Sequence, residues 1–135
     1  MHKQLTIDQW KIIENNFNPS INAENETIFA LSNGYIGMRG TFEEGYTSNP
    51  SQTIDGIYLN GFYETDTIRY PEAAYGYAKT NQTMLNVTNS RYIKIYIDGE
   101  LFHMFADGIE SYKRVLDMQK GVTTRKITWQ NNKGK

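Results

Sequence analysis

Hydrophobic and polar residues alternate along several short stretches of the chain, and this period of two predicts β-strands. In the clearest stretch, residues 91–97 place three isoleucines on one face and two tyrosines and a lysine on the other. Asp98-Gly99 then supplies a tight-turn signal, and residues 100–105 return with apolar alternation. Apolar alternation on both sides of Asp-Gly predicts a β-hairpin over residues 91–105.

Other segments predict further strands. They are residues 10–17, 83–87, 111–117 and 122–129. Asn33-Gly34 predicts a second tight turn, just after a short apolar run over residues 28–31. Residues 41–80 are the least regular part and are expected to form a long connection rich in Tyr and Gly. Because no long stripe with a helical period occurs, the pattern predicts one mostly-β unit.

The composition supports a single folded domain. The 135 residues are 39% hydrophobic and 13% aromatic, which is too apolar for a disordered tail. A formal net charge of -1 gives no basic surplus for nucleic acid or an anionic membrane. The chain has no apolar run of membrane-spanning length and no signal peptide, so we expect a soluble, cytoplasmic protein.

Several kinds of reactive site are excluded by residue counts. The chain has no cysteine, which excludes disulfides, thiol nucleophiles and cysteine-ligated metals. Its two histidines, His2 and His103, are too few and too far apart for a histidine metal cluster. The glycines at positions 34, 37 and 40 do not have the dinucleotide-binding spacing. We interpret them as a strand edge where a glycine allows close backbone approach.

Paired carboxylates are the remaining candidates for catalysis, because glycoside cleavage uses carboxyl groups that flank one bond. The pairs are Glu24/Glu26, Glu43/Glu44 and Asp98/Glu100. Glu43 and Glu44 would point to opposite faces of an extended segment, and Asp98 belongs to a turn. We therefore interpret all three pairs as solvated acids near turns. The aromatic residues in 56–77 could stack on a sugar ring or serve as packing.

A series of longer motifs is more specific. It comprises Trp10-x-Ile12-x-Glu14-x-x-Phe17, ETIFALSNGYIGMRGTFEEG (residues 26–45), YLNGFYE (58–64), PEAAYGYA (71–78), TMLNV (83–87) and RVLDMQKGVTTRKITW (114–129). In this order, from about residue 8 to residue 130, the series resembles the amino-terminal domain of glycoside hydrolase family 65. That family contains maltose, kojibiose, nigerose and trehalose phosphorylases and some α-glucoside hydrolases.

The resemblance implies a fold and an activity. The fold is an antiparallel β-supersandwich of the galactose-mutarotase type, followed in the family by a helical linker, an (α/α)6 barrel and a small β-domain. A Glu in the barrel protonates the glycosidic oxygen while inorganic phosphate, the co-substrate, attacks the anomeric carbon. The product is β-glucose 1-phosphate, no metal or organic cofactor takes part, and members are commonly homodimers.

The chain departs from the family in length. The matching domain should be about twice as long, so residues 1–135 are expected to be the first part of the sandwich, with the barrel absent. No catalytic, cofactor-binding or metal residue is therefore assigned. Glu43, Glu44 and Glu64 match family positions, but in motifs of the non-catalytic domain. A sandwich with only half of its strands would have unpaired strands at its sheet edges. We therefore expect the isolated chain to be poorly stable.

The sequence thus predicts a non-catalytic segment of an α-glucoside phosphorylase. The parent, a phosphorylase or a hydrolase, would act on a small-molecule sugar through the barrel, and a kojibiose- or maltose-type enzyme is preferred. The acceptor-site residues are expected beyond Lys135. The alternative is a stand-alone carbohydrate-binding or structural, oligomerisation β-module.

Overall fold

The computed structural model describes residues 5–46 and 52–134, and in them antiparallel β-structure dominates. Four strands form one sheet in the order β1-β2-β9-β10. They are β1 (Leu5–Asp8), β2 (Lys11–Glu14), β9 (Ile109–Asp117) and β10 (Val122–Trp129). The first and last strands of the chain thus share a sheet, because β2 pairs with β9 as well as with β1.

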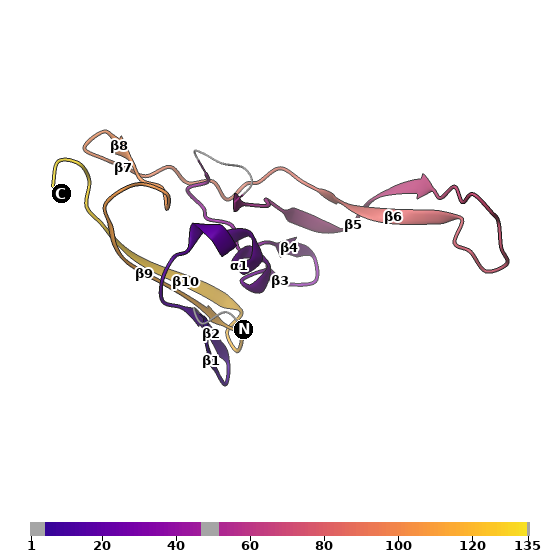
Figure 1. The fold of residues 1–135 in the computed structure, drawn as a ribbon, viewed down its shortest axis with the longest axis horizontal. Coiled ribbons are helices and arrows are strands. Elements are labelled where there is room, and N and C mark those ends of the chain that lie inside the picture. The colour runs from indigo at the N-terminus through magenta and orange to yellow at the C-terminus, as the bar shows by residue number, and fades with distance from the viewer. Residues whose placement is uncertain (1–4, 47–51, 135) are drawn as a thin grey trace.

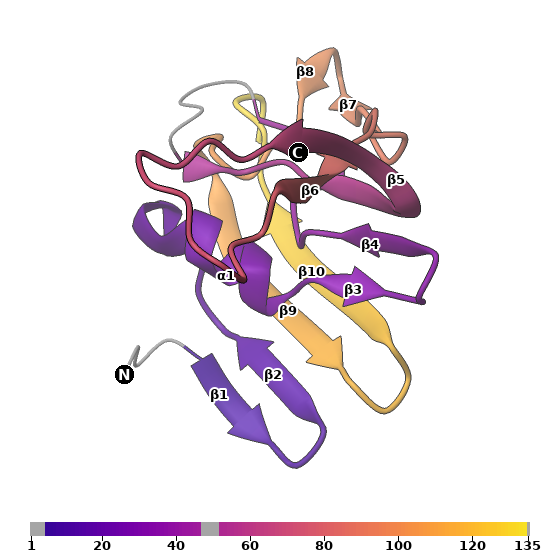
Figure 2. The same cartoon turned by 90° about the vertical axis from the view of Figure 1, so that its right-hand side faces the viewer.

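A second four-stranded sheet has the order β3-β4-β5-β6. Its strands are β3 (Leu31–Ser32), β4 (Ile36–Met38), β5 (Ile57–Thr67) and β6 (Thr80–Asn86). A small hairpin of β7 (Tyr96–Ile97) and β8 (Glu100–Leu101) completes the strands of the described residues. Figure 2 shows the two larger sheets as separate layers, with the helical segment beside them.

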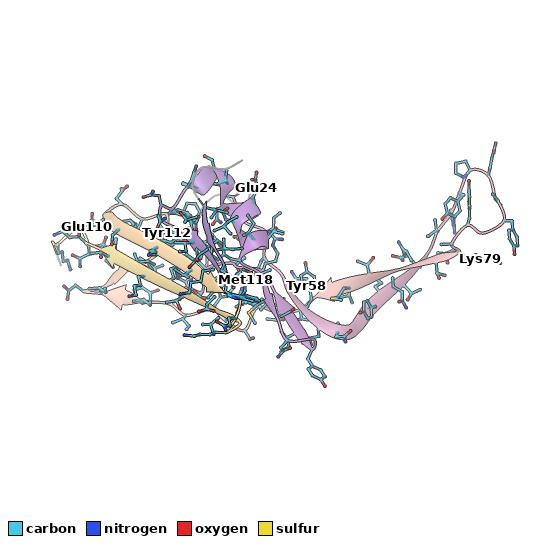
Figure 3. The ribbon with its side chains drawn as sticks, turned by 90° about the horizontal axis from the view of Figure 1, so that it is seen from below. Glu24, Tyr58, Lys79, Glu110, Tyr112 and Met118 are labelled. Atoms are coloured by element: carbon cyan, nitrogen blue, oxygen red, sulfur yellow. The ribbon has the colours of Figure 1, made fainter. Side chains whose placement is uncertain are left out.

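The far part of β5 and β6 forms a two-stranded arm that projects from the body (Figure 1). The pairing register of β5 with β6 shifts between Tyr58 and Tyr63. Gly61, which lies in this interval, has a φ of 85°. A bulge of this kind bends a strand, and positive φ suits glycine. Figure 3 shows the arm leaving the body near Tyr58 and reaching its far end near Lys79. Most side chains of the arm are exposed, so the arm contributes little to the core.

The core lies on one face of the first sheet. Phe42, Phe102, Met104 and Tyr112 form a buried cluster, and Phe17 packs its ring edge-on against Phe42 at 5.6 Å between centroids. Only Tyr112 of these residues lies on a strand of the sheet. The residues that cover this face of the sheet lie in segments outside the strands. For this reason the periodicity of the strands alone does not locate the core.

Two expected strands are confirmed closely. Residues 111–117 and 122–129 form most of β9 and all of β10, with the turn at Gly121 between them. Residues 10–17 contain β2, residues 83–87 overlap β6, and the turn at Asn33-Gly34 joins β3 to β4. The class of fold, mostly antiparallel β, is therefore as expected.

Three expectations about elements are wrong. The hairpin over residues 91–105 has its turn at Asp98-Gly99, but the paired strands have only two residues each. The described residues of the region 41–80 contain β5, an eleven-residue strand, rather than an irregular connection, and residues 47–51 of this region lie outside the described residues. A 3-10 turn, η1 (Pro19–Ile21), leads into the helix α1 (Asn22–Ile28), which the sequence pattern did not predict.

The helix was missed because its buried face is polar. Asn22, Asn25 and Glu26 are its buried residues, so NAENETI shows no apolar stripe. Asn18 caps the preceding turn by accepting a hydrogen bond from the Ser20 amide at 3.0 Å. Within the described residues no helix is long enough to cross a membrane.

Candidate functional site

Three glutamates are almost fully buried inside the body of the molecule. Glu14, Glu26 and Glu44 are exposed by 1%, 0% and 2%. A buried carboxylate is costly unless it is paired and hydrogen-bonded. The expectation that the acid pairs containing Glu26 and Glu44 are solvated is therefore wrong, and the partners of each glutamate decide what it can do.

Glu14 on β2 is held by two residues of β9. Its Oε2 accepts hydrogen bonds from the Tyr112 hydroxyl at 2.7 Å and from Arg114 Nε at 2.9 Å. Asn25 Nδ2 donates to Oε1 at 2.5 Å. Arg114 is also buried, and its guanidinium stacks over the Phe29 ring at 4.0 Å. Burial is the main cause that raises the pKa of Tyr112, so its hydroxyl remains a donor.

Glu26 on α1 ties the helix to the loop before β5. Its Oε1 accepts hydrogen bonds from Tyr46 at 2.5 Å and from Thr53 at 2.6 Å, and its Oε2 accepts from the Ile54 amide at 2.8 Å. Arg39 Nη2 lies 3.8 Å from Oε2. Burial, followed by the hydrogen bond to Glu26, raises the pKa of Tyr46 to about 12.

Glu43 and Glu44 both contact Arg125 on β10. Arg125 Nη1 donates to Glu44 Oε1 at 2.7 Å, and Nη2 lies 3.1 Å from Glu43 Oε2. The segment is not extended, so these two acids do not point to opposite faces: the chain turns, and the Gly45 amide donates to the Phe42 carbonyl at 3.1 Å. Burial lowers the pKa of Arg125, but the carboxylates of Glu44 and Glu43 outweigh it and hold that pKa above its usual value.

The third acid pair lies in the small hairpin. Asp98 occupies its turn with a φ of 53°, as expected for that position. Glu100 accepts a hydrogen bond from Asn132 Nδ2 at 2.6 Å. Glu64, the remaining family-matching glutamate, lies on the exposed arm opposite Thr83. The structure thus separates Glu64 from Glu43 and Glu44, and brings no two of these acids together around open space for a sugar.

A cavity of roughly 350 Å³ lies among the buried ion pairs. Arginines contribute most of its polar lining, with Glu43 the one acid among the lining residues. The lining arginines are Arg39, Arg91, Arg114 and Arg125. Phe29 and Phe42 supply an apolar wall, and the Arg125 guanidinium lies 4.4 Å from the Phe42 ring centroid. Sequence reasoning missed this site, because its arginines are far apart along the chain.

Most of the predicted aromatic segment 56–77 lies on the arm, whereas Gly56 at its start accepts a hydrogen bond from the amide of the cavity residue Arg39 at 2.9 Å. Tyr70 and Tyr77 have ring centroids 4.8 Å apart, and Tyr75 is fully exposed. The glycine interpretation is confirmed at Gly40, where a Cβ would lie 2.7 Å from the Phe29 Cβ. His103 lies beside the core residues Phe102 and Met104, and His2 falls outside the described residues.

Comparison with known proteins shows the family. A model described as "Glycosyl hydrolase family 65, N-terminal domain" matches residues 12–135, so the chain belongs to that family. It is 52% identical over 128 residues to an α,α-trehalose phosphorylase of Thermoanaerobacter brockii, covering 95% of this chain and 16% of that protein. A kojibiose phosphorylase of Caldanaerobacter subterraneus is 34% identical over 94% of this chain and 14% of its own length.

A solved structure gives the same family. The chain described as "Putative kojibiose phosphorylase from human microbiome" superposes with a TM-score of 0.77 at 33% identity, over 96% of this chain and 17% of that one. The expected amino-terminal β-sandwich of this family is thereby confirmed. The chain spans about one-sixth of the length of the relatives it matches.

Proposed function

We propose that this chain is a non-catalytic segment of an α-glucoside phosphorylase. The observation that supports this most strongly is the similarity of nearly the whole chain to phosphorylases six times its length. The buried acids add a physical reason. Glu14, Glu26 and Glu44 are all engaged by cations and donors inside the body. Such carboxylates stabilise a scaffold, because their oxygens are occupied by donors of the same domain rather than directed at a substrate.

In this proposal, the working acid lies in the part of the parent protein outside residues 1–135. That acid would protonate the glycosidic oxygen while inorganic phosphate attacks the anomeric carbon, with no organic cofactor. The glycosidic C–O bond breaks, a C–O bond to phosphate forms, and the proton leaves with the released sugar. The expected products are β-glucose 1-phosphate and the second sugar.

We propose α,α-trehalose as the first disaccharide to test, in place of the kojibiose- or maltose-type substrate that the sequence favoured. The basis is the degree of similarity. Identity is 52% to one trehalose phosphorylase and 37% to another, against 34% and 35% for a kojibiose and a maltose phosphorylase.

The test compares the longer parent protein with the 135-residue chain. Trehalose, kojibiose and maltose are supplied with and without inorganic phosphate, and glucose 1-phosphate and glucose are measured. We expect phosphate-dependent glucose 1-phosphate release by the parent and none by the chain. Glucose release without phosphate would make the parent a hydrolase, and turnover by residues 1–135 alone would contradict the non-catalytic role.

A further inference from the structure

The arginine-lined cavity contains one guanidinium, that of Arg91, that forms no ion pair with a described residue, whereas Arg125 contacts two carboxylates. We propose that this cavity binds a small oxyanion, either inorganic phosphate or the phosphate group of a monoester. This goes beyond the proposed function, because it assigns a ligand to the scaffold itself.

The first argument is the charge at Arg91. The other three lining arginines each have a carboxylate: Arg39 lies 3.8 Å from Glu26, Arg114 lies 2.8 Å from Glu14, and Arg125 contacts Glu44. Arg91 forms no ion pair with any described residue, and its Nη2 donates to the neutral Thr41 hydroxyl. The nearest acid in this network is Asp55, whose Oδ1 lies 3.5 Å from the Thr41 hydroxyl. A partly buried guanidinium without a directly paired carboxylate favours an anion from outside.

The second argument is a set of unsatisfied buried donors. Within the described part of the chain, Arg91 Nε and Thr123 Oγ1 are buried and make no hydrogen bond. Arg114 Nη2 lies near Glu14, but it too lacks a well-directed hydrogen bond. All three residues line the same cavity. Buried polar groups in folded proteins nearly always have a partner, so an acceptor that reached Arg91 Nε and Thr123 Oγ1 from the cavity would satisfy both donors.

The third argument is the chemistry of those donors. A guanidinium presents planar, forked N–H groups that match the oxygens of phosphate, and a hydroxyl adds a further donor. Glu43 is the one acid in the lining, and Arg125 holds its carboxylate at 3.1 Å. A volume of roughly 350 Å³ exceeds that of several waters, at about 30 Å³ each. The cavity therefore has room for a phosphate group with part of its hydration or with an attached sugar.

The experiment titrates the ¹⁵N-labelled 135-residue chain with inorganic phosphate and, separately, with glucose 1-phosphate at constant ionic strength. Arginine Nε–Hε signals in a ¹H–¹⁵N spectrum report the site and whether the chain is folded. We expect saturable shifts of the Arg91 Nε–Hε signal. Tighter binding of glucose 1-phosphate than of phosphate would identify the monoester as the ligand, and the reverse order would identify the free ion.

Variants separate this site from general attraction of anions. Arg91→Gln removes the charge and should weaken binding at least tenfold, whereas Arg91→Lys should retain part of it. The matched control Arg69→Gln removes an equal charge from the exposed arm and should leave binding unchanged. If the chain alone gives an unfolded spectrum, the same variants are compared in the longer parent by calorimetric titration, where the co-substrate site adds its own binding event and only the event weakened by Arg91→Gln reports the cavity. A folded protein without saturable binding, or equal weakening by both Gln variants, would overturn the proposal.

Discussion

Buried ion pairs connect parts of this fold that are far apart in the sequence. Each buried charge depends on one particular distant residue. Glu14 and Arg114 are separated by 100 positions, and Glu44 and Arg125 by 81. No local pattern distinguishes these acids from solvated ones. The sequence offered Glu44 as a candidate acid and Glu14 only as part of a longer motif. The burial of both follows from the pairing of β2 with β9 and from the turn after Phe42.

Replacing Arg114 by Ala should leave Glu14 charged and buried without its cation. We expect a loss of about 3–5 kcal/mol in the free energy of unfolding, which is the usual effect of removing one partner of a buried pair. Lost packing against Phe29 would add to it. Urea unfolding followed by tryptophan fluorescence measures the change. Arg69→Ala, on the exposed arm, is the control and should change stability by less than about 0.5 kcal/mol; similar losses for the two variants would contradict the ion-pair argument.

The raised pKa of Tyr46 predicts how the free energy of unfolding changes at high pH. Its pKa is about 12 in the folded chain and near 10 when unfolded. Because the folded pKa is the higher one, the unfolded state loses this proton first. The contribution of Tyr46 to the free energy of unfolding should be fully present below pH 10. It should be lost between pH 10 and pH 12, and the loss should reach about 2 kcal/mol.

The measurement compares urea midpoints of the wild type and Tyr46→Phe from pH 9 to pH 12. The variant should be less stable at pH 9, because Glu26 loses a hydrogen bond, and should lose less stability above pH 10. Tyr75→Phe, fully exposed on the arm, is the matched control and should follow the wild type. An identical pH dependence for Tyr46→Phe and the wild type would refute the assignment.

At the scale of elements, sequence pattern succeeded where one face of a strand is buried. Burial alternates strictly along β10 and from Tyr112 onward in β9, and both strands were predicted within two residues. β5 was missed because Asn60-Gly61 reads as a chain break, whereas the structure uses Gly61 in a bulge. The 91–105 hairpin was overestimated, since Ile93 and Ile95 alternate but are 59% and 46% exposed. Alternation in the sequence shows that a strand could have an apolar face. Whether that face is buried depends on the residues that pack against it.

Gly40 joins two elements that could not approach with a larger residue. Its amide donates to the Glu26 carbonyl of α1 at 2.8 Å, and an added Cβ would lie 2.8 Å from the Phe29 carbonyl oxygen. Gly40→Ala should therefore destabilise the fold by about 1–3 kcal/mol through overpacking. Gly37→Ala is the control, because its Cβ would meet only Ser32 Cβ at 3.8 Å. Thermal melts of both variants test this, and equal melting temperatures would be the contrary result.

The whole molecule has a larger accessible surface than a compact monomer of the same mass. Its accessible surface is 9610 Å², whereas a compact monomer of 15.6 kDa exposes about 7,250 Å². Part of the excess belongs to the projecting arm (Figure 1). Another part is apolar: Phe62, Ile93 and Ile95 are each about half exposed. In the longer parent that we propose, this surface would be available to contact the remaining domains.

An excess of exposed apolar surface should make the isolated chain associate. β10 is also an edge strand of its sheet and offers unpaired backbone groups, which invite pairing with another chain. We expect the weight-average mass measured by analytical ultracentrifugation to rise with concentration, and the thermal transition to be broad. The double variant Phe62→Lys/Ile95→Lys adds charge to the apolar surface and should weaken association at least fivefold. Gln82→Lys/Ser90→Lys adds the same charge at exposed polar positions and should associate as the wild type does. A sharp melt with a concentration-independent monomer mass would show that residues 1–135 form a self-sufficient globule, and the scaffold interpretation would then lose its physical basis.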